Sequence, residues 1–248
     1  WNVHPMAVPI TESWEGSICT GSWIQNGETE YLYYTVRRRG ASAPICRSIS
    51  SDGYHFTKDK DFGFTLSEKY DGASARDPKV ILGEDGLYHM FLTTVLVKEN
   101  KGCLAHCISK DLETWEEAEN PVHTVENSDH PECPDYFKYK GKYYFMWSAG
   151  DWTKGTYRVN VARSLSLLGD FSNYKTILET GDCDFANGPG HNGYFYIPEK
   201  DKYLMVYHRH HNEINDGNAR FLCIDDMSFD ENGDIEKIKM TKQWKIDF

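Results

Sequence analysis

Four segments of the sequence can be laid over one another: EYLYYT at 30–35, LYHMFL at 87–92, YYFMWS at 143–148 and YLMVYH at 203–208. Their first residues lie 56 to 60 positions apart, and each segment follows a turn signal such as Asn26-Gly27 or Asp85-Gly86. Because aromatic and β-branched residues suit a pleated sheet, the segments predict equivalent β-strands. A repeat of this length indicates a modular fold.

A second strand is predicted after each aromatic one, and a short strand before it. The strands that follow are ICRSIS at 45–50, LAHCIS at 104–109, VNVARS at 159–164 and RFLCID at 220–225. No stretch of ten or more residues with helical periodicity interrupts them. Tandem all-β modules of this size predict a β-propeller, whose sheets pack face to face around an axis. A β-sandwich is the alternative, but it gives no reason for the constant spacing.

The composition narrows the range of partners. The chain has 248 residues, with 27 Lys and Arg against 38 Asp and Glu, and a net charge of −11. Nucleic acid and anionic membranes bind basic faces, so neither is an expected partner. We expect no membrane-spanning helix, because no run of 18 apolar residues is present. The oligomeric state is left open.

The cysteines and the first residues bear on the setting of the protein. There are seven cysteines, an odd number without zinc-site spacing, and we expect them to be mostly reduced and buried. This slightly favours the cytoplasm. The chain starts Trp1-Asn2-Val3, with no initiator Met and no leader pattern, so we expect it to begin inside a longer gene product.

Polar residues occur where the first strand of each later module begins. Asp77, Glu132 and His191 are 55 and 59 residues apart, so we expect them at corresponding points of successive modules, facing one axis. Two carboxyl groups facing a pocket can cleave an acetal: one protonates the leaving oxygen and the other stabilises cationic charge or activates water. Glu132 is the candidate acid, and Asp77 beside Arg76 is expected to be ionised.

Aromatic residues would supply stacking faces for sugar rings. Trp23 and Trp147 are the candidates for substrate binding, and Trp152 is a further one.

Other residues of these regions have plainer interpretations. Cys133 is predicted to pack beside the acid rather than act as a nucleophile, because no histidine is placed to pair with it. His208 and His210 share a strand face while His211 points away, which favours a solvated strand end over a metal cluster.

Several motifs of the sequence resemble those of known glycosidase families. RDP at 76–78 and ECPD at 132–135 resemble the propeller glycosidases of glycoside hydrolase family 32, the fructofuranosidases. GPGHN at 188–192 and YLMVYHR at 203–209 look like the last blade of the family 43 arabinanases, arabinofuranosidases and xylosidases. The resemblance covers nearly the whole chain, and the last-blade motif favours family 43.

The resemblance implies an all-β, five-bladed β-propeller as a single domain over 1–248, with its first blade incomplete. Trp1–Pro9 resembles the outer strand that ends a first blade. The implied segments are 1–20 for the end of blade one, 21–70 for blade two, 71–126 for blade three, 127–182 for blade four and 183–248 for blade five.

The resemblance also implies site roles. Glu132 matches the general acid, and Asp77 matches the carboxylate that orients the substrate, with Arg76 beside it in the substrate site. His191 matches a histidine on the pocket floor that contacts substrate and can bind an ion, directly or through water. No cofactor is required, and a structural calcium ion at the axis is the one metal implied.

The expected function is hydrolysis of arabinofuranosyl or xylosyl linkages in plant-type oligosaccharides or polysaccharides, with inversion. Both families place a further aspartate in the first blade, and no aspartate precedes Asp52, so we expect that base upstream of Trp1. The alternatives are a retaining family 32 fructofuranosidase and a non-catalytic carbohydrate-binding propeller.

Overall fold

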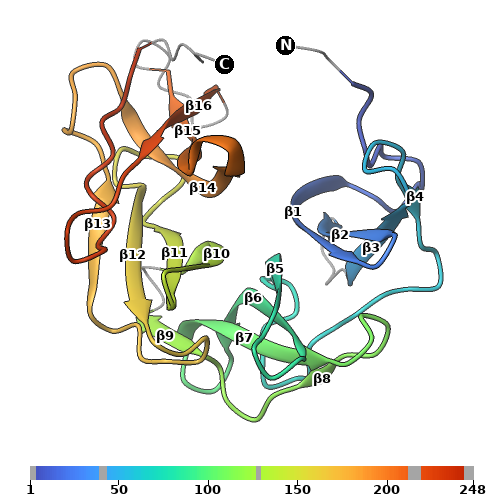
Figure 1. The fold of residues 1–248 in the computed structure, drawn as a ribbon. Coiled ribbons are helices and arrows are strands. Elements are labelled where there is room, and N and C mark those ends of the chain that lie inside the picture. The colour runs from blue at the N-terminus through green and yellow to red at the C-terminus, as the bar shows by residue number, and fades with distance from the viewer. Residues whose placement is uncertain (1–3, 39–43, 127–129, 212–218, 243–248) are drawn as a thin grey trace. The chain divides into compact units, whose positions relative to one another are not determined.

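A computed structural model of the chain describes residues 4–38, 44–126, 130–211 and 219–242 (Figure 1). These residues form β-strands joined by turns, with a short 3-10 helix at Pro198–Lys200. The fold is therefore all-β. None of the helical structure in the described ranges is long and apolar enough to cross a membrane.

The strands form four antiparallel sheets that follow one another along the chain. The first contains β1 (Ser17–Asn26), β2 (Thr29–Arg37), β3 (Ile45–Ser50) and β4 (Thr57–Lys58). The second contains β5 (Arg76–Leu82), β6 (Tyr88–Leu96), β7 (Lys101–Ser109), β8 (Glu116–Glu117) and β9 (His123–Glu126). The third contains β10 (Glu132–Tyr139), β11 (Lys142–Ala149), β12 (Arg158–Ser164) and β13 (Tyr174–Leu178). The fourth contains β14 (Asn187–Ile197), β15 (Lys202–His210) and β16 (Arg220–Met227).

The predicted repeat is confirmed strand by strand. The four aromatic segments lie in β2, β6, β11 and β15, and the segments after them lie in β3, β7, β12 and β16. Tandem antiparallel sheets whose strands pair in chain order, apart from β9 on β7, are typical of propeller blades. The described residues thus form four propeller blades.

Residues 4–20 lead into the first sheet. Residues 4–16 form no strand, since Pro5 and Pro9 lack backbone donors and the amides of Thr11 and Glu12 donate to Glu15 Oε2 in a turn. Residues 17–20 already belong to β1 and pair with β2 in the first sheet. Residues 1–3 lie outside the described ranges.

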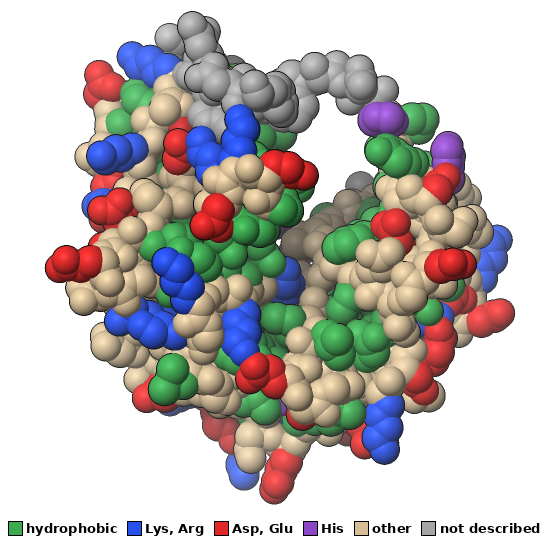
Figure 2. Space-filling model, viewed as in Figure 1, with side chains coloured by type: hydrophobic (Ala, Val, Ile, Leu, Met, Phe, Trp, Pro, Cys, Tyr) green, Lys and Arg blue, Asp and Glu red, His purple; other side chains and the backbone are tan. Residues whose placement is uncertain are grey.

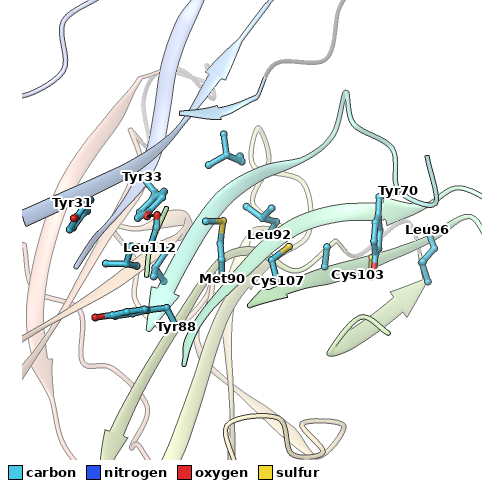
Figure 3. Close-up of a cluster of buried hydrophobic side chains, with 13 residues drawn as sticks. Tyr31, Tyr33, Tyr70, Tyr88, Met90, Leu92, Leu96, Cys103, Cys107 and Leu112 are labelled. Atoms are coloured by element: carbon cyan, nitrogen blue, oxygen red, sulfur yellow. Dashed lines mark hydrogen bonds between the residues drawn. The ribbon is translucent and has the colours of Figure 1, made fainter. Parts of the chain in front are cut away.

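The chain divides into two compact units, Trp1–Asn127 and Ser128–Phe248, each with two of the sheets. The core of the first unit lies between its two sheets, where Met90 and Leu92 of β6 and Cys107 of β7 pack with Tyr33 of β2 (Figure 3). The Tyr33 hydroxyl donates to the Leu112 carbonyl at 2.7 Å. In the second unit, residues of β11, β12 and β15 pack in the same way.

Neighbouring sheets within each unit are also joined by side-chain to backbone hydrogen bonds. In the first unit the Val80 amide donates to Ser22 Oγ at 3.0 Å, and in the second the Tyr194 amide donates to Asp135 Oδ2 at 3.1 Å. Buried amides need partners, so these bonds hold one inner strand against the next.

Two expectations about composition can be compared with the structure. None of the seven cysteines forms a disulfide, and burial raises the pKa of the Cys103 thiol to about 12. On the visible surface, Lys and Arg side chains are intermingled with Asp and Glu (Figure 2).

Candidate active site

The inner strands of three sheets begin with the same backbone feature, a β-bulge at which the pairing register shifts. One non-glycine residue in each bulge has a positive φ: Asp77 at 54°, Cys133 at 51° and His191 at 56°. For such residues a left-handed backbone costs about 1–2 kcal/mol, and it persists where the surrounding structure imposes it, often at functional sites. The bulges at Cys133 and His191 therefore mark a candidate site in the second unit, and the bulge at Asp77 marks the corresponding strand start in the first unit.

The residue that precedes each positive-φ residue is paired with a residue of the neighbouring strand. These pairs are Arg76 with Thr93, Glu132 with Ser148, and Gly190 with His208. Cys133, not Glu132, is therefore the structural equivalent of Asp77. Our alignment of Asp77, Glu132 and His191 was wrong by one residue at Glu132, because the spacing along the chain does not reveal which residue bulges.

Glu132 is held by a tyrosine that lies just before β12. The Tyr157 hydroxyl donates to Glu132 Oε2 at 2.9 Å, and the Tyr157 side chain is buried. A Cβ at position 190 would lie 2.2 Å from the Tyr157 ring, so only glycine leaves room for the ring there. Sequence reasoning gave Tyr157 no role, although its place just before β12 was visible.

Cys133 and His191 meet across the two sheets of the second unit. Cys133 Sγ lies 2.9 Å from His191 Nδ1. We predicted that no histidine would be placed to pair with this cysteine, and that was wrong. The two residues are 58 positions apart in sequence, and the two bulges bring them into contact.

Hydrogen bonds fix the backbone on both sides of this contact. The His191 amide donates to Ser148 Oγ at 2.8 Å, and Ser148 Oγ donates to Asn192 Oδ1 at 2.8 Å. Asn192 Nδ2 in turn donates to the Cys133 carbonyl at 3.2 Å. Ser148, Asn192 and Cys133 are buried, so the arrangement is well held.

Asp77 and Arg76 lie in the first unit, whereas Glu132 and His191 lie in the second. The Asp77 side chain is buried, its amide donates to Thr35 Oγ1 at 3.0 Å, and Arg76 Nε lies 3.8 Å from Asp77 Oδ2. The Asp77 carboxyl group thus lies beside a guanidinium group within the first unit.

Comparison with known proteins supplies the next step. The family model described as Glycosyl hydrolases family 43 matches residues 123–235, which cover most of the second unit. The β-D-galactofuranosidase xynD of Aspergillus niger is 26% identical over 97% of this chain and 72% of its own length. The chain is a glycosidase related to family 43.

Two further likenesses extend this result. A cell-wall β-fructofuranosidase of Pisum sativum is 32% identical over 74 residues, 29% of this chain and 13% of the relative. The solved structure of an α-L-arabinanase of Cellvibrio cellulosa, in complex with arabinohexaose, has a TM-score of 0.71 at 19% identity, over 94% of this chain and 83% of that one. The second likeness supports the propeller fold of the glycosidase.

We predicted that the histidines at the end of β15 form a solvated strand end, and that was wrong. His210 is buried, and its Nε2 lies 2.8 Å from the Trp152 carbonyl. The His208 ring stacks between Tyr157 and His191, at centroid distances of 5.7 and 5.8 Å. Burial, and after it the charge of Arg220, lowers the pKa of His208 to about 3, so this ring is neutral at ordinary pH.

The tryptophans of the glycosidase differ from their predicted roles. Trp147 is 1% exposed and packs against Phe145 and Tyr174, so it has no free face for a sugar. Trp23 is exposed, but it lies towards the β1–β2 turn, where its Nε1 donates to Glu30 Oε2 at 2.6 Å. Trp152 is 38% exposed in the loop after β11.

The neighbours of His191 can be compared with what the implied calcium ion would need. Calcium prefers six to eight oxygen ligands, whereas the contacts of the His191 ring include a thiol and another imidazole. In the described part of the chain, no group of three or more His, Cys, Asp or Glu side chains could hold an ion.

Proposed function

We propose that this glycosidase hydrolyses furanosides, arabinofuranosyl linkages first, with Glu132 as the general acid and Asp77 as the orienting carboxylate. The observation that carries the proposal is the position of Glu132 at a strand start, with one carboxyl oxygen held by buried Tyr157. A hydroxyl that donates to Oε2 leaves Oε1 to carry the proton that the leaving oxygen receives.

The preference for a five-membered ring is supported by the relatives. The Aspergillus niger protein is named for galactofuranose and the Pisum sativum protein for fructofuranose. Xylosyl linkages are the next substrate class under the same mechanism. The proposal includes a fifth blade beyond the four sheets described. The base is not assigned, because no aspartate precedes Asp52.

A retaining fructofuranosidase is the second candidate. It is favoured by the ECPD motif at 132–135 and by the 32% identity to the pea enzyme. The two mechanisms differ in stereochemistry: inverting enzymes hold their carboxyl pair about 6.5–9.5 Å apart and retaining ones about 5–5.5 Å. The anomer released first, read by NMR, distinguishes them.

A substrate screen with two matched variants tests the proposal. The substrates are an aryl arabinofuranoside, an aryl galactofuranoside, an aryl xyloside and sucrose. We expect a furanoside to be cleaved, Glu132→Gln to lose about 10²–10⁴-fold in kcat on an arabino-oligosaccharide, whose leaving oxygen is strongly basic, and Glu199→Gln to match the native protein. Glu199 is an exposed residue in the turn between β14 and β15 and serves as the control.

Each other outcome has a definite meaning. Cleavage of xyloside alone overturns the ring preference, and cleavage of sucrose alone moves the assignment to the fructofuranosidase. Unchanged kcat of Glu132→Gln on the arabino-oligosaccharide removes Glu132 as the acid.

A further inference from the structure

The contact between Cys133 and His191 bears on where the imidazole carries its proton. A neutral histidine has one protonated ring nitrogen, and the hydrogen bond made by the other nitrogen decides which one it is. Here Nδ1 is 2.9 Å from a buried thiol, too close for a water molecule between them.

The chemistry of the pair favours one arrangement of protons. If the thiol donates to Nδ1, the ring proton lies on Nε2. If the thiol has given its proton to the ring, both nitrogens are protonated and Nε2 again carries a proton. Only an Nδ1–H that donates to sulfur leaves Nε2 without a proton. Thiol sulfur is a weak acceptor, whereas an unprotonated imidazole nitrogen is a good acceptor for the S–H group, which is itself a weak donor.

The surroundings keep the pair in this geometry. The Cys133 carbonyl is held by Asn192 and the His191 amide by Ser148, so neither bulge can turn without breaking buried hydrogen bonds. The Tyr157 hydroxyl lies 4.0 Å from Cys133 Sγ and bonds Glu132, which places the pair next to the proposed acid.

We propose that Cys133 is a positioning residue whose thiol keeps a proton on His191 Nε2, so that His191 offers a hydrogen-bond donor to the glycoside and does not ligate a metal ion. The role towards the glycoside rests on the proposed function, in which Glu132 is the acid. A protonated Nε2 has no lone pair for calcium, which sets this chain apart from the ion-binding histidine that the resemblance implied.

The test is NMR of the full chain labelled with ¹⁵N-histidine at neutral pH. The His191 ring signals are assigned by their loss in His191→Gln. We expect a protonated Nε2 in the native protein, signals shifted towards mixed tautomers in Cys133→Ala, and the native pattern restored in Cys133→Ser, whose hydroxyl can also donate. Cys46→Ala, which removes a buried thiol from β3, is the control and leaves the His191 signals unchanged.

Kinetics give a second measurement on the same variants. Loss of an oriented donor to the bound glycoside should raise KM about tenfold in Cys133→Ala, with a smaller change in kcat, and Cys133→Ser should return towards the native value. Equal kinetics in all variants remove the role in substrate binding.

Three spectral results would overturn the proposal: a proton on Nδ1 alone in the native protein, an unchanged His191 spectrum in Cys133→Ala, or a shift of the His191 nitrogens when calcium chloride is added. The native spectrum and the calcium titration need no cysteine variant, so a misfolded variant does not block the test. These spectra are read whether or not the protein hydrolyses a substrate. Failure of the proposed function would be seen separately, as no release by the native protein or no effect of Glu132→Gln.

Discussion

The strand starts at Asp77 and at His191 have the same backbone and different chemistry. Their φ angles are 54° and 56°. Both amides donate to a hydroxyl on the second strand of the preceding sheet: Asp77 to Thr35 of β2 at 3.0 Å, and His191 to Ser148 of β11 at 2.8 Å. Asp77 is buried beside Arg76, whereas His191 is half-buried against Cys133. The repeat thus fixes the backbone, while each side chain and its neighbours decide the chemistry.

The comparison extends to the residues that face the strand starts. Thr35 faces Cys19, Ser148 faces Glu132, and His208 faces Gly190, so His208 occupies the place of the two hydroxyl residues. It is the only one of the three that can titrate.

The largest expected effect therefore concerns His208. Its pKa is lowered to about 3 in the fold, against about 6.5 in the unfolded chain. As the pH falls, the unfolded state takes up the proton first. The free energy of unfolding is therefore highest above about pH 6.5 and decreases as the pH drops towards 3, by on the order of 3 kcal/mol at about pH 4. The native protein should thus be less stable at about pH 4 than at about pH 7. In His208→Thr the contribution of His208 to this difference in unfolding free energy should be absent, as measured by urea denaturation.

The control for this experiment is His4→Gln, which changes an exposed histidine. It should leave the pH difference as in the native protein. A His208→Thr variant with the native pH difference would contradict the neutral state of the half-buried His208.

The next effect concerns the glycine that faces His208. In Gly190→Ala the new methyl group meets the Tyr157 ring, so we expect a loss of about 2 kcal/mol in unfolding free energy and a lower kcat as Tyr157 moves away from Glu132. Gly193→Ala, in the same strand, places its Cβ 4.0 Å from its nearest neighbour and should change little. Equal losses in both variants would show that strand propensity, not the tyrosine, sets the requirement.

The paired hydroxyls should differ in a graded way. Thr35→Ala leaves one buried amide without its partner and should cost about 1 kcal/mol, whereas Ser148→Ala also removes the bond to Asn192 and should cost about 2 kcal/mol. Thr35→Ser and Ser148→Thr keep the hydroxyl and should restore most of the stability in denaturant titrations. The equivalence of the two starts fails if either alanine variant is as stable as the native protein.

The smallest effect concerns the support of the acid. Tyr157→Phe removes the hydroxyl from Glu132 and should lower kcat about tenfold on the preferred furanoside, with KM nearly unchanged. Tyr174→Phe is the matched control, because Tyr174 is half-exposed at the start of β13. An unchanged kcat in Tyr157→Phe would mean that Glu132 is oriented by other contacts.

The strands could be predicted from sequence because the aromatic segments repeat at nearly constant spacing and each blade is built from local, antiparallel pairs. The positions of Asp77, Glu132 and His191 near strand starts were predictable for the same reason. The one-residue difference between Glu132 and Cys133 was not, because a bulge adds a residue to one strand without a mark in the spacing.

Two further features depend on contacts between sheets. The Cys133–His191 contact joins bulges in different blades, and neither residue has a local pattern that names the other. Trp147 was predicted to face substrate, but its ring packs against Phe145 of the same strand and against Tyr174. Which face of a strand is covered depends on the packing partner, and periodicity alone does not identify it.

The role of Glu132 as the acid is tested most directly by the leaving group. An acid is needed when the leaving oxygen is strongly basic, as in a sugar–sugar linkage, and hardly at all for a dinitrophenolate. We predict that Glu132→Gln loses about 10²–10⁴-fold in kcat/KM on an arabino-oligosaccharide and stays near the native value on the dinitrophenyl arabinofuranoside. An equal loss on both substrates would contradict the assignment.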